Sequence, residues 1–151
     1  MNKIELISLK LKTFTDQNIL DYCLLNNINH LNIIELNLSN NKLTDISGVK
    51  LFKNLENLYL SNNEIKDISV LKDLKNLKIL HFFNNETTDI SFIKNFINLE
   101  ELSISNLNLK NEYKILNILK NLKNLKILIC YRIFNKFNIK KELKNVNVFS
   151  F

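Results

Sequence analysis

The sequence predicts an α/β solenoid, in which short stacked coils form one parallel β-sheet on one side and a row of short helical segments on the other. A 22-residue pattern occurs three times without insertion, over residues 33–54, 55–76 and 77–98. Each copy has apolar residues in the spacing L-x-x-L-x-L, then an Asn, then the triplet Asp-Ile-Ser. A period of about 20–29 residues with this leucine spacing indicates coils that bury a shared core only when stacked.

The L-x-x-L-x-L segment of each coil predicts a short β-strand. In the middle copy Leu58 and Leu60 alternate, so both point into the solenoid. The residues that alternate with them are expected on the opposite, concave face of the sheet: Asn57, Tyr59 and Ser61. We therefore expect a sheet of about 6–7 short parallel strands, with 3-10 or α-helical segments on the convex side.

The polar residues of the repeat have a structural interpretation. The Asn that follows each strand (Asn41, Asn63, Asn85) can satisfy backbone groups that a turn inside the coil leaves unpaired, so we expect a ladder of buried amides. In the Asp-Ile-Ser triplet, Asp67 and Ser69 stand where a short helical turn needs its free N–H groups accepted. A calcium role for these aspartates is weaker than this capping role.

One domain is expected over residues 1–151. Residues 1–32 are an N-terminal capping coil, in which Ile4, Ile7 and Leu9 are expected to form a strand in the same register and Thr15 or Asp16 to cap a helix. The regular repeats occupy 33–98. The remaining parts are a longer helical repeat over 99–124, with Asn111 as cap, and a C-terminal coil with an edge strand over 125–151.

Composition and the chain start favour a cytoplasmic protein. The N-terminal residues break each apolar run with Lys or Glu, so no signal peptide or membrane span is expected. Cys23 and Cys130 fall in coils about 24 Å apart at strand spacing, too far for a disulfide. The absence of Ala and Pro and the excess of Asn, Lys, Ile and Leu indicate an AT-rich organism or virus.

No catalytic residue, metal ligand set or cofactor is predicted. His30 and His81 lie apart, and no Cys/His/Asp cluster has metal-ligand spacing. A single glycine excludes Gly-rich phosphate loops and a nucleophile elbow. The sequence therefore predicts a protein that is not an enzyme.

The expected concave face carries the candidate binding residues. Tyr59, Ile79, His81 and Phe83 are expected at its centre, and exposed aromatic residues on a rigid sheet are typical of a protein-binding hot spot. A second group contains Ile129 and Tyr131, which a terminal helix could instead cover. Ordinary exposed apolar residues are the alternative explanation for both groups.

The net charge of +6 raises a second candidate function. Apart from Lys10, Glu35 and Glu101, the expected concave positions are uncharged, whereas the lysines fall in convex segments: Lys50, Lys53, Lys72, Lys75, Lys94, Lys120, Lys123, Lys140, Lys141 and Lys144. A spread lysine face is more often a solvated surface than a binding stripe. Electrostatic binding of nucleic acid or anionic membrane through these lysines is therefore the alternative, with nucleic acid the less favoured partner.

The repeats resemble the 22-residue class of leucine-rich repeats, found in bacterial internalins and in regulators of protein phosphatase 1. The resemblance rests on the pattern over residues 33–98 and is looser elsewhere. It implies a right-handed horseshoe that binds a protein on its concave face. Taken together, we expect a non-enzymatic protein-interaction module, a regulator or host-interaction factor, that is monomeric or weakly associated through its C-terminal edge strand.

Overall fold

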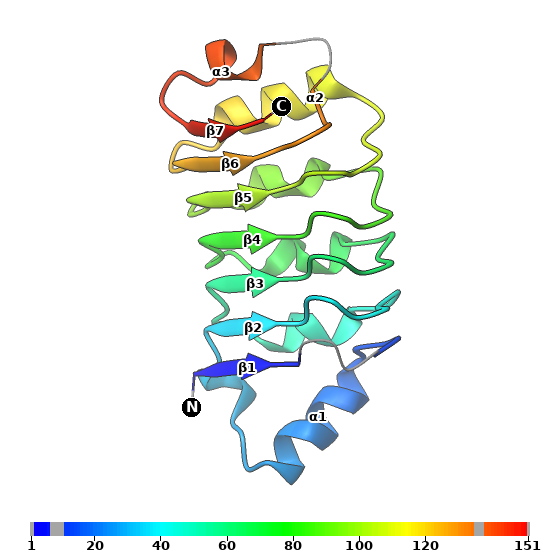
Figure 1. Ribbon diagram of the computed structural model, residues 1–151. Helices are drawn as coiled ribbons and strands as arrows, with labels where there is room; N and C mark the ends of the chain where they lie inside the picture. Colours follow the sequence, from blue (N-terminus) through cyan, green and yellow to red (C-terminus); the bar gives the residue numbers. More distant parts are fainter. Residues whose placement is uncertain (1, 7–10, 135–137, 151) are drawn as a thin grey trace.

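A computed structural model describes residues 2–6, 11–134 and 138–150. Its described strands form a single parallel sheet in chain order (Figure 1): β1 (Lys3–Glu5), β2 (Glu35–Asn37), β3 (Asn57–Tyr59), β4 (Ile79–His81), β5 (Glu101–Ser103), β6 (Ile127–Ile129) and β7 (Asn147–Phe149). The segments on the other side are α1 (Asp16–Leu25), η1 (His30–Asn32), η2 (Ser47–Leu51), η3 (Ser69–Asp73), η4 (Ser91–Asn95), α2 (Glu112–Asn121) and α3 (Ile139–Glu142). The predicted solenoid of parallel strands with 3-10 and α-helical convex segments is confirmed.

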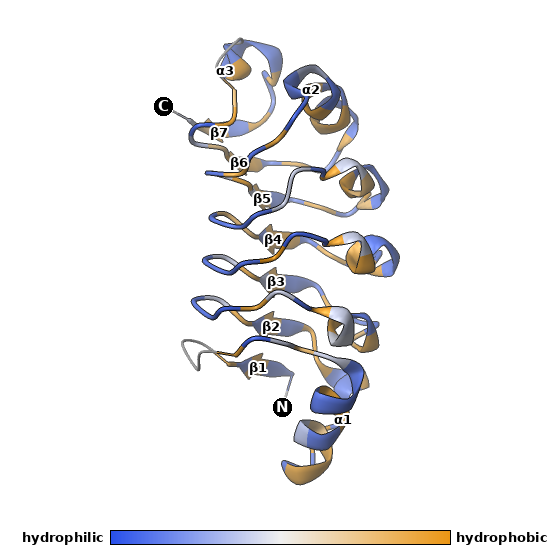
Figure 2. Cartoon of the chain, turned by 90° about the vertical axis from the view of Figure 1, so that its right-hand side faces the viewer, coloured by the Kyte–Doolittle hydropathy of each residue, from blue (hydrophilic) through white to orange (hydrophobic). Residues whose placement is uncertain are grey.

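The core is a set of apolar columns between the sheet and the helical layer. Leu36 pairs with Leu58, which pairs with Leu80 in the next coil, and all three side chains are fully buried. Apolar residues of the helical segments, such as Leu71 and Leu74 in and after η3, close the other side of the core. Figure 2 shows the sheet and the helical layer side by side, with hydrophobic residues (orange) in both.

The first strand is a correction to the sequence-based register. Ile4 pairs with Leu36 and therefore takes the middle apolar slot of the motif, whereas we expected it in the first slot. Ile7 and Leu9, expected in the same strand, lie outside the described residues. The same offset continues at the bridge between Thr13 and Asp45. The sequence is compatible with both alignments, because Ile4 and Phe14 fall on buried apolar positions of the next coil in either one.

The two ends of the solenoid carry true α-helices, as predicted. Thr15 caps α1 and forms a capping box with Asn18, and Asn111 caps α2 by accepting the N–H of Lys114 at 2.9 Å. The predicted seventh strand is present as β7, but its register differs from the expected one. Val148 pairs with Leu128 and is buried, whereas Phe149, which the V-x-x-F-x-F pattern of residues 146–151 would place inward, is exposed. The short helix α3 was not predicted; it lies beside α2, where Glu142 pairs with Lys120 at 2.6 Å. It therefore does not cover β6 from the concave side.

Candidate functional site

The concave face is the side of the sheet that points away from the core. It comprises the first and third residues of each strand and the residue two positions further on, where described: Lys3, Glu5, Glu35, Asn37, Ser39, Asn57, Tyr59, Ser61, Ile79, His81, Phe83, Glu101, Ser103, Ser105, Ile127, Ile129, Tyr131, Asn147 and Phe149. The strand backbones are fixed by in-register pairing on both sides from β2 to β6. These side chains are therefore displayed on a rigid support.

The centre of this face is an aromatic pair anchored by a carboxylate. The rings of Tyr59 and His81 meet edge to face, with centroids 5.2 Å apart and planes at 87°. His81 Nε2 lies 2.7 Å from Glu101 Oε1. Tyr59 and His81 are register partners on β3 and β4, which places their side chains next to each other. Each of the two rings is half-buried, which leaves part of its surface open to a partner.

Charged contacts extend this cluster towards β1. Lys3 Nζ lies 2.6 Å from Glu35 Oε1 and 3.0 Å from Glu5 Oε1, and the Asn57 amide donates to Glu35 at 3.4 Å. The hydrogen bond from Lys3 is the main cause of the lowered pKa of Glu35. The sequence analysis missed this group because the register predicted for β1 was wrong. In the observed register, Lys3 pairs with Glu35 at the same position of the motif.

Strand β5 separates the two predicted aromatic groups. Ser103 and Ser105 lie on the concave side, yet they are only 1% and 5% exposed. Larger residues stand beside Ser103 on both sides, since it pairs with His81 on β4 and with Ile129 on β6. The face therefore has a low strip of serines along β5, flanked by bulky side chains about 10 Å apart across two strand spacings.

The face becomes apolar towards its C-terminal end. Ile127 and Ile129 on β6 are half-buried, and Phe149 on β7 is 44% exposed. Tyr131 is also half-buried, and its backbone N–H donates to Ser105 Oγ at 2.9 Å. The structure thus brings Ile129 and Tyr131 onto the same face as the Tyr59–His81 pair, although β5 lies between them.

Comparison with known proteins identifies the repeats. A family profile described as leucine-rich repeats, in two copies, matches residues 31–73 and again 53–95. The matched residues, 31–95, are therefore leucine-rich repeats. A search of curated proteins found no significant match.

Solved leucine-rich repeat structures share this fold. Internalin C2 of Listeria monocytogenes has a TM-score of 0.74 at 24% identity, over 97% of this chain and 69% of that one. A leucine-rich repeat protein of Leptospira interrogans has a TM-score of 0.70 at 18% identity, over 99% of this chain and 42% of that one. A chain of the Drosophila melanogaster SNF/U2A′ complex gives 0.60 at 15% identity, over 94% and 79%. At these identities the likeness shows the fold, and the chain spans less than half of the Leptospira protein.

The convex lysines of this leucine-rich repeat are mixed with acidic residues. Lys50 pairs with Asp16 at 2.8 Å, and Lys120 pairs with Glu142. Lys72 and Lys75 stand exposed in and just after η3, where the Lys75 ammonium donates to the Lys72 carbonyl. The convex side therefore presents interleaved charges rather than one continuous basic stripe.

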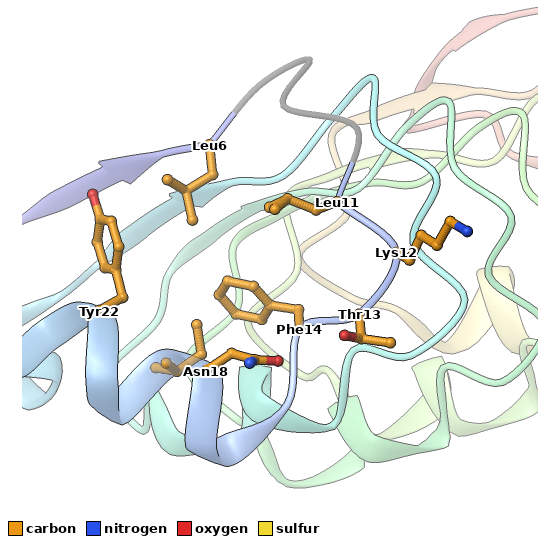
Figure 3. A pocket seen from close by; sticks show the side chains of 8 residues that line it. Leu6, Leu11, Lys12, Thr13, Phe14, Asn18 and Tyr22 are labelled. Carbon is orange, nitrogen blue, oxygen red and sulfur yellow. The ribbon is translucent and has the colours of Figure 1, made fainter.

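Within 2–6, 11–134 and 138–150, no three His, Cys, Asp or Glu side chains are grouped as a metal site would require. Over the same ranges, none of the helices has the length and apolar character needed to cross a bilayer. An apolar pocket of about 470 Å³ lies between α1 and the segment that enters it (Figure 3), lined by residues that include Leu6, Phe14 and Tyr22. It lies at the open N-terminal end of the core.

Proposed function

We propose that this leucine-rich repeat is a non-enzymatic protein-interaction module that binds a protein partner on its concave face. The centre of the contact is the group Tyr59, Ile79, His81 and Phe83, and the second contact is Ile129 with Tyr131. The observation that carries this proposal is the partly exposed Tyr59–His81 pair, fixed by Glu101 on a sheet of paired strands.

Binding on such a surface loses little conformational entropy. The Tyr59 and His81 rings already contact each other, and the strands beneath them are held by neighbours on both sides. Aromatic side chains that are ordered before binding supply a large contact area without the cost of fixing rotamers. Because Phe83 is half-buried beyond the end of β4, part of its ring is also available.

The test is a binding measurement with a partner isolated by affinity capture from the source cells. We expect Phe83→Ala to weaken binding of that purified partner by about 2 kcal/mol or more, roughly thirtyfold in Kd. The matched control is the double variant Lys72→Glu with Lys75→Glu, which changes the convex side and should leave the affinity unchanged. Thermal melts of both variants verify that neither change unfolds the protein.

The alternative is electrostatic binding of nucleic acid or anionic membrane by the convex lysines. Its supporting observation is the exposure of Lys72 and Lys75 together with the net charge of +6. It predicts retention on heparin that collapses between low and moderate salt, and loss of retention in the double lysine variant. If that variant abolishes partner binding while Phe83→Ala does not, the convex face is the functional one.

The cellular setting forms part of the proposal. Cys23 and Cys130 are both free and buried, which is compatible with a reducing cytoplasm. The codon bias inferred from composition favours an AT-rich organism or virus, where the protein would act as a regulator or a host-interaction factor.

The exposed Phe149 on β7 marks the edge through which weak self-association of an otherwise monomeric protein would occur. Fractionation of source cells and sedimentation of the pure protein test these two points.

A further inference from the structure

The concave face is acidic although the chain is basic. Among its described residues the carboxylates of Glu5, Glu35 and Glu101 face one ammonium, that of Lys3. The whole chain carries a formal charge of +6. A partner that approaches this face therefore meets local charge of the opposite sign to that of the molecule as a whole, and charge complementarity favours a basic partner surface there.

The acidic groups are arranged around an aromatic ring. Glu101 is hydrogen-bonded to His81, whose ring contacts that of Tyr59, and Glu35 pairs in register with Asn57, two residues before Tyr59. Burial raises the pKa of Tyr59, and the carboxylates of Glu35 and Glu101 raise it further. Glu35 is shared with Lys3, whereas Glu101 is hydrogen-bonded to the imidazole of His81. A carboxylate accepts several hydrogen bonds, so both retain capacity for a further donor. A lysine or arginine side chain over Tyr59 would meet a ring face and two carboxylates.

The opposite end of the face has a different chemistry. The concave positions of β6 and β7 are Ile127, Ile129, Asn147 and Phe149, without a charge among them. A charged partner side chain placed there would lose its hydration without gaining an opposite charge. The low serine strip of Ser103 and Ser105 lies between the two ends. The chemistry of the face therefore changes along the solenoid axis, from charged near the N-terminal strands to uncharged and largely apolar at β6 and β7.

We propose that the partner contacts this face through a segment that crosses the strands, with a lysine or arginine over Tyr59 and apolar side chains over β6 and β7. The inference rests on the proposed function and adds the chemistry and direction of the bound segment. From β3 to β7 the distance is about 19 Å at the spacing of paired strands. That distance corresponds to about six extended residues or about thirteen helical ones.

The experiment uses a random peptide library of about sixteen residues, displayed on phage and selected on the full chain. The wild-type protein should enrich peptides that carry Lys or Arg at a fixed spacing from an apolar group, and should deplete Asp and Glu at that basic position. Synthetic peptides of the enriched sequence should bind at least about tenfold more weakly when the salt concentration is raised from low to physiological or above.

Variants separate this inference from the proposed function. The double variant Glu35→Lys with Glu101→Lys should bind the peptides selected on the wild type at least about tenfold more weakly. Selection on this variant should enrich acidic residues at the position where the wild type enriches Lys or Arg. Glu35→Gln with Glu101→Gln is the milder form, and Lys72→Glu with Lys75→Glu is the convex control, which should select the same peptides as wild type. Far-ultraviolet circular dichroism establishes that each variant is folded.

Each remaining outcome has a defined meaning. If Phe83→Ala weakens peptide binding but both glutamate double variants leave the affinity unchanged, the inference of a basic segment is overturned and binding on the concave face still stands. Peptides that bind Phe83→Ala and the glutamate variants equally well would overturn both. Selection of acidic or uncharged sequences by the wild type, or of no common sequence, would show that the face does not take a basic, apolar-ended segment.

Discussion

Asn63 accepts the backbone N–H of Leu43 at 3.0 Å and so joins two successive coils through a buried hydrogen bond. Its amide nitrogen also donates to the carbonyls of Leu60 at 2.8 Å and Leu38 at 3.0 Å. Asn41 and Asn85 repeat this arrangement one coil to either side. The predicted amide ladder is confirmed, with each amide bonded to its own coil and to the preceding one.

Replacing Asn63 by Leu should lower the free energy of unfolding by about 1–3 kcal/mol, because the backbone groups it serves are buried and would be left unpaired. Urea denaturation followed by circular dichroism measures the change. The matched control is Asn76→Leu, since Asn76 is exposed and donates a long hydrogen bond of 3.4 Å to the Lys53 carbonyl. That change should stay within about 0.5 kcal/mol. Equal midpoints for Asn63→Leu and wild type would contradict a structural role for the ladder.

Gly48 is required by the close approach of the chain that enters α1. A Cβ built at this position would lie 2.6 Å from the carbonyl oxygen of Thr15 and 2.8 Å from that of Phe14. Both contacts are with backbone, which cannot rotate away. In the two following coils the same repeat position holds the larger residues Val70 and Phe92.

Gly48→Ala should therefore destabilise the protein by about 1–3 kcal/mol through steric overlap. The matched control is Val70→Ala at the equivalent position of the next coil, where half-buried methyl groups are removed without a clash and a smaller loss is expected. Thermal denaturation of both variants measures the difference. A Gly48→Ala protein as stable as wild type would show that the entry to α1 can shift at little cost.

The regular coils could be predicted because their periodicity repeats one physical requirement three times. The N-terminal coil could not, since a single copy gives no second example to fix its register, and the strand lies where Ile4 pairs with Leu36. A second asparagine ladder was also missed. Asn40, Asn62 and Asn84 have positive φ values of 53–58° and are linked side chain to side chain at 2.7 Å. The second Asn of each doublet already explained why an Asn follows the strand, so the first Asn carried no separate signal.

The candidate site was predicted in composition but not in contacts. Alternation along β3 and β4 places Tyr59 and His81 side by side, which follows from strand geometry alone. The pairing of His81 with Glu101 depends on rotamers, and the position of Lys3 depends on the register of β1. Neither can be derived from one sequence.

Asp67 should make the stability depend on pH in the acid range. The backbone N–H of Ser69 donates to its carboxylate at 2.8 Å and lowers its pKa below the ordinary value. A lowered native pKa means that the stabilisation is complete above the unfolded pKa of about 3.9 and is lost as the pH falls through the lower native pKa. The urea concentration at the midpoint of unfolding should therefore decrease as the pH is lowered below about 4.

Asp67→Asn separates titration from hydrogen bonding, because the amide oxygen can still accept the Ser69 N–H. This variant should be nearly as stable as wild type at pH 7 and should lose less stability on acidification. Asp67→Ala removes the acceptor and should cost about 1 kcal/mol at neutral pH. Urea titrations across pH 2–7 compare the three proteins. Identical pH profiles for wild type and Asp67→Asn would show that this carboxylate does not contribute.

The two thiols should be unreactive until the protein unfolds. Cys130 is 1% exposed and burial raises its pKa to about 12, while burial also raises the pKa of Cys23. The thiolate is the reactive form, so at pH 8 both groups should react with Ellman's reagent only as fast as the chain opens, and at once in guanidinium chloride. Native and reduced protein should have the same mass, since both cysteines are free.

The same burial gives alkaline pH a defined effect on stability. Above about pH 8.5 an unfolded thiol ionises, whereas native Cys130 holds its proton until about pH 12. The unfolded state is then favoured, and stability should fall with rising pH by up to about 1.4 kcal/mol per pH unit from this group. Cys130→Ala should lack this part of the slope, which the difference between the two proteins isolates from the titration of lysines. Fast labelling of Cys130 in the folded protein, or equal alkaline slopes for wild type and variant, would show that the thiol is open to solvent.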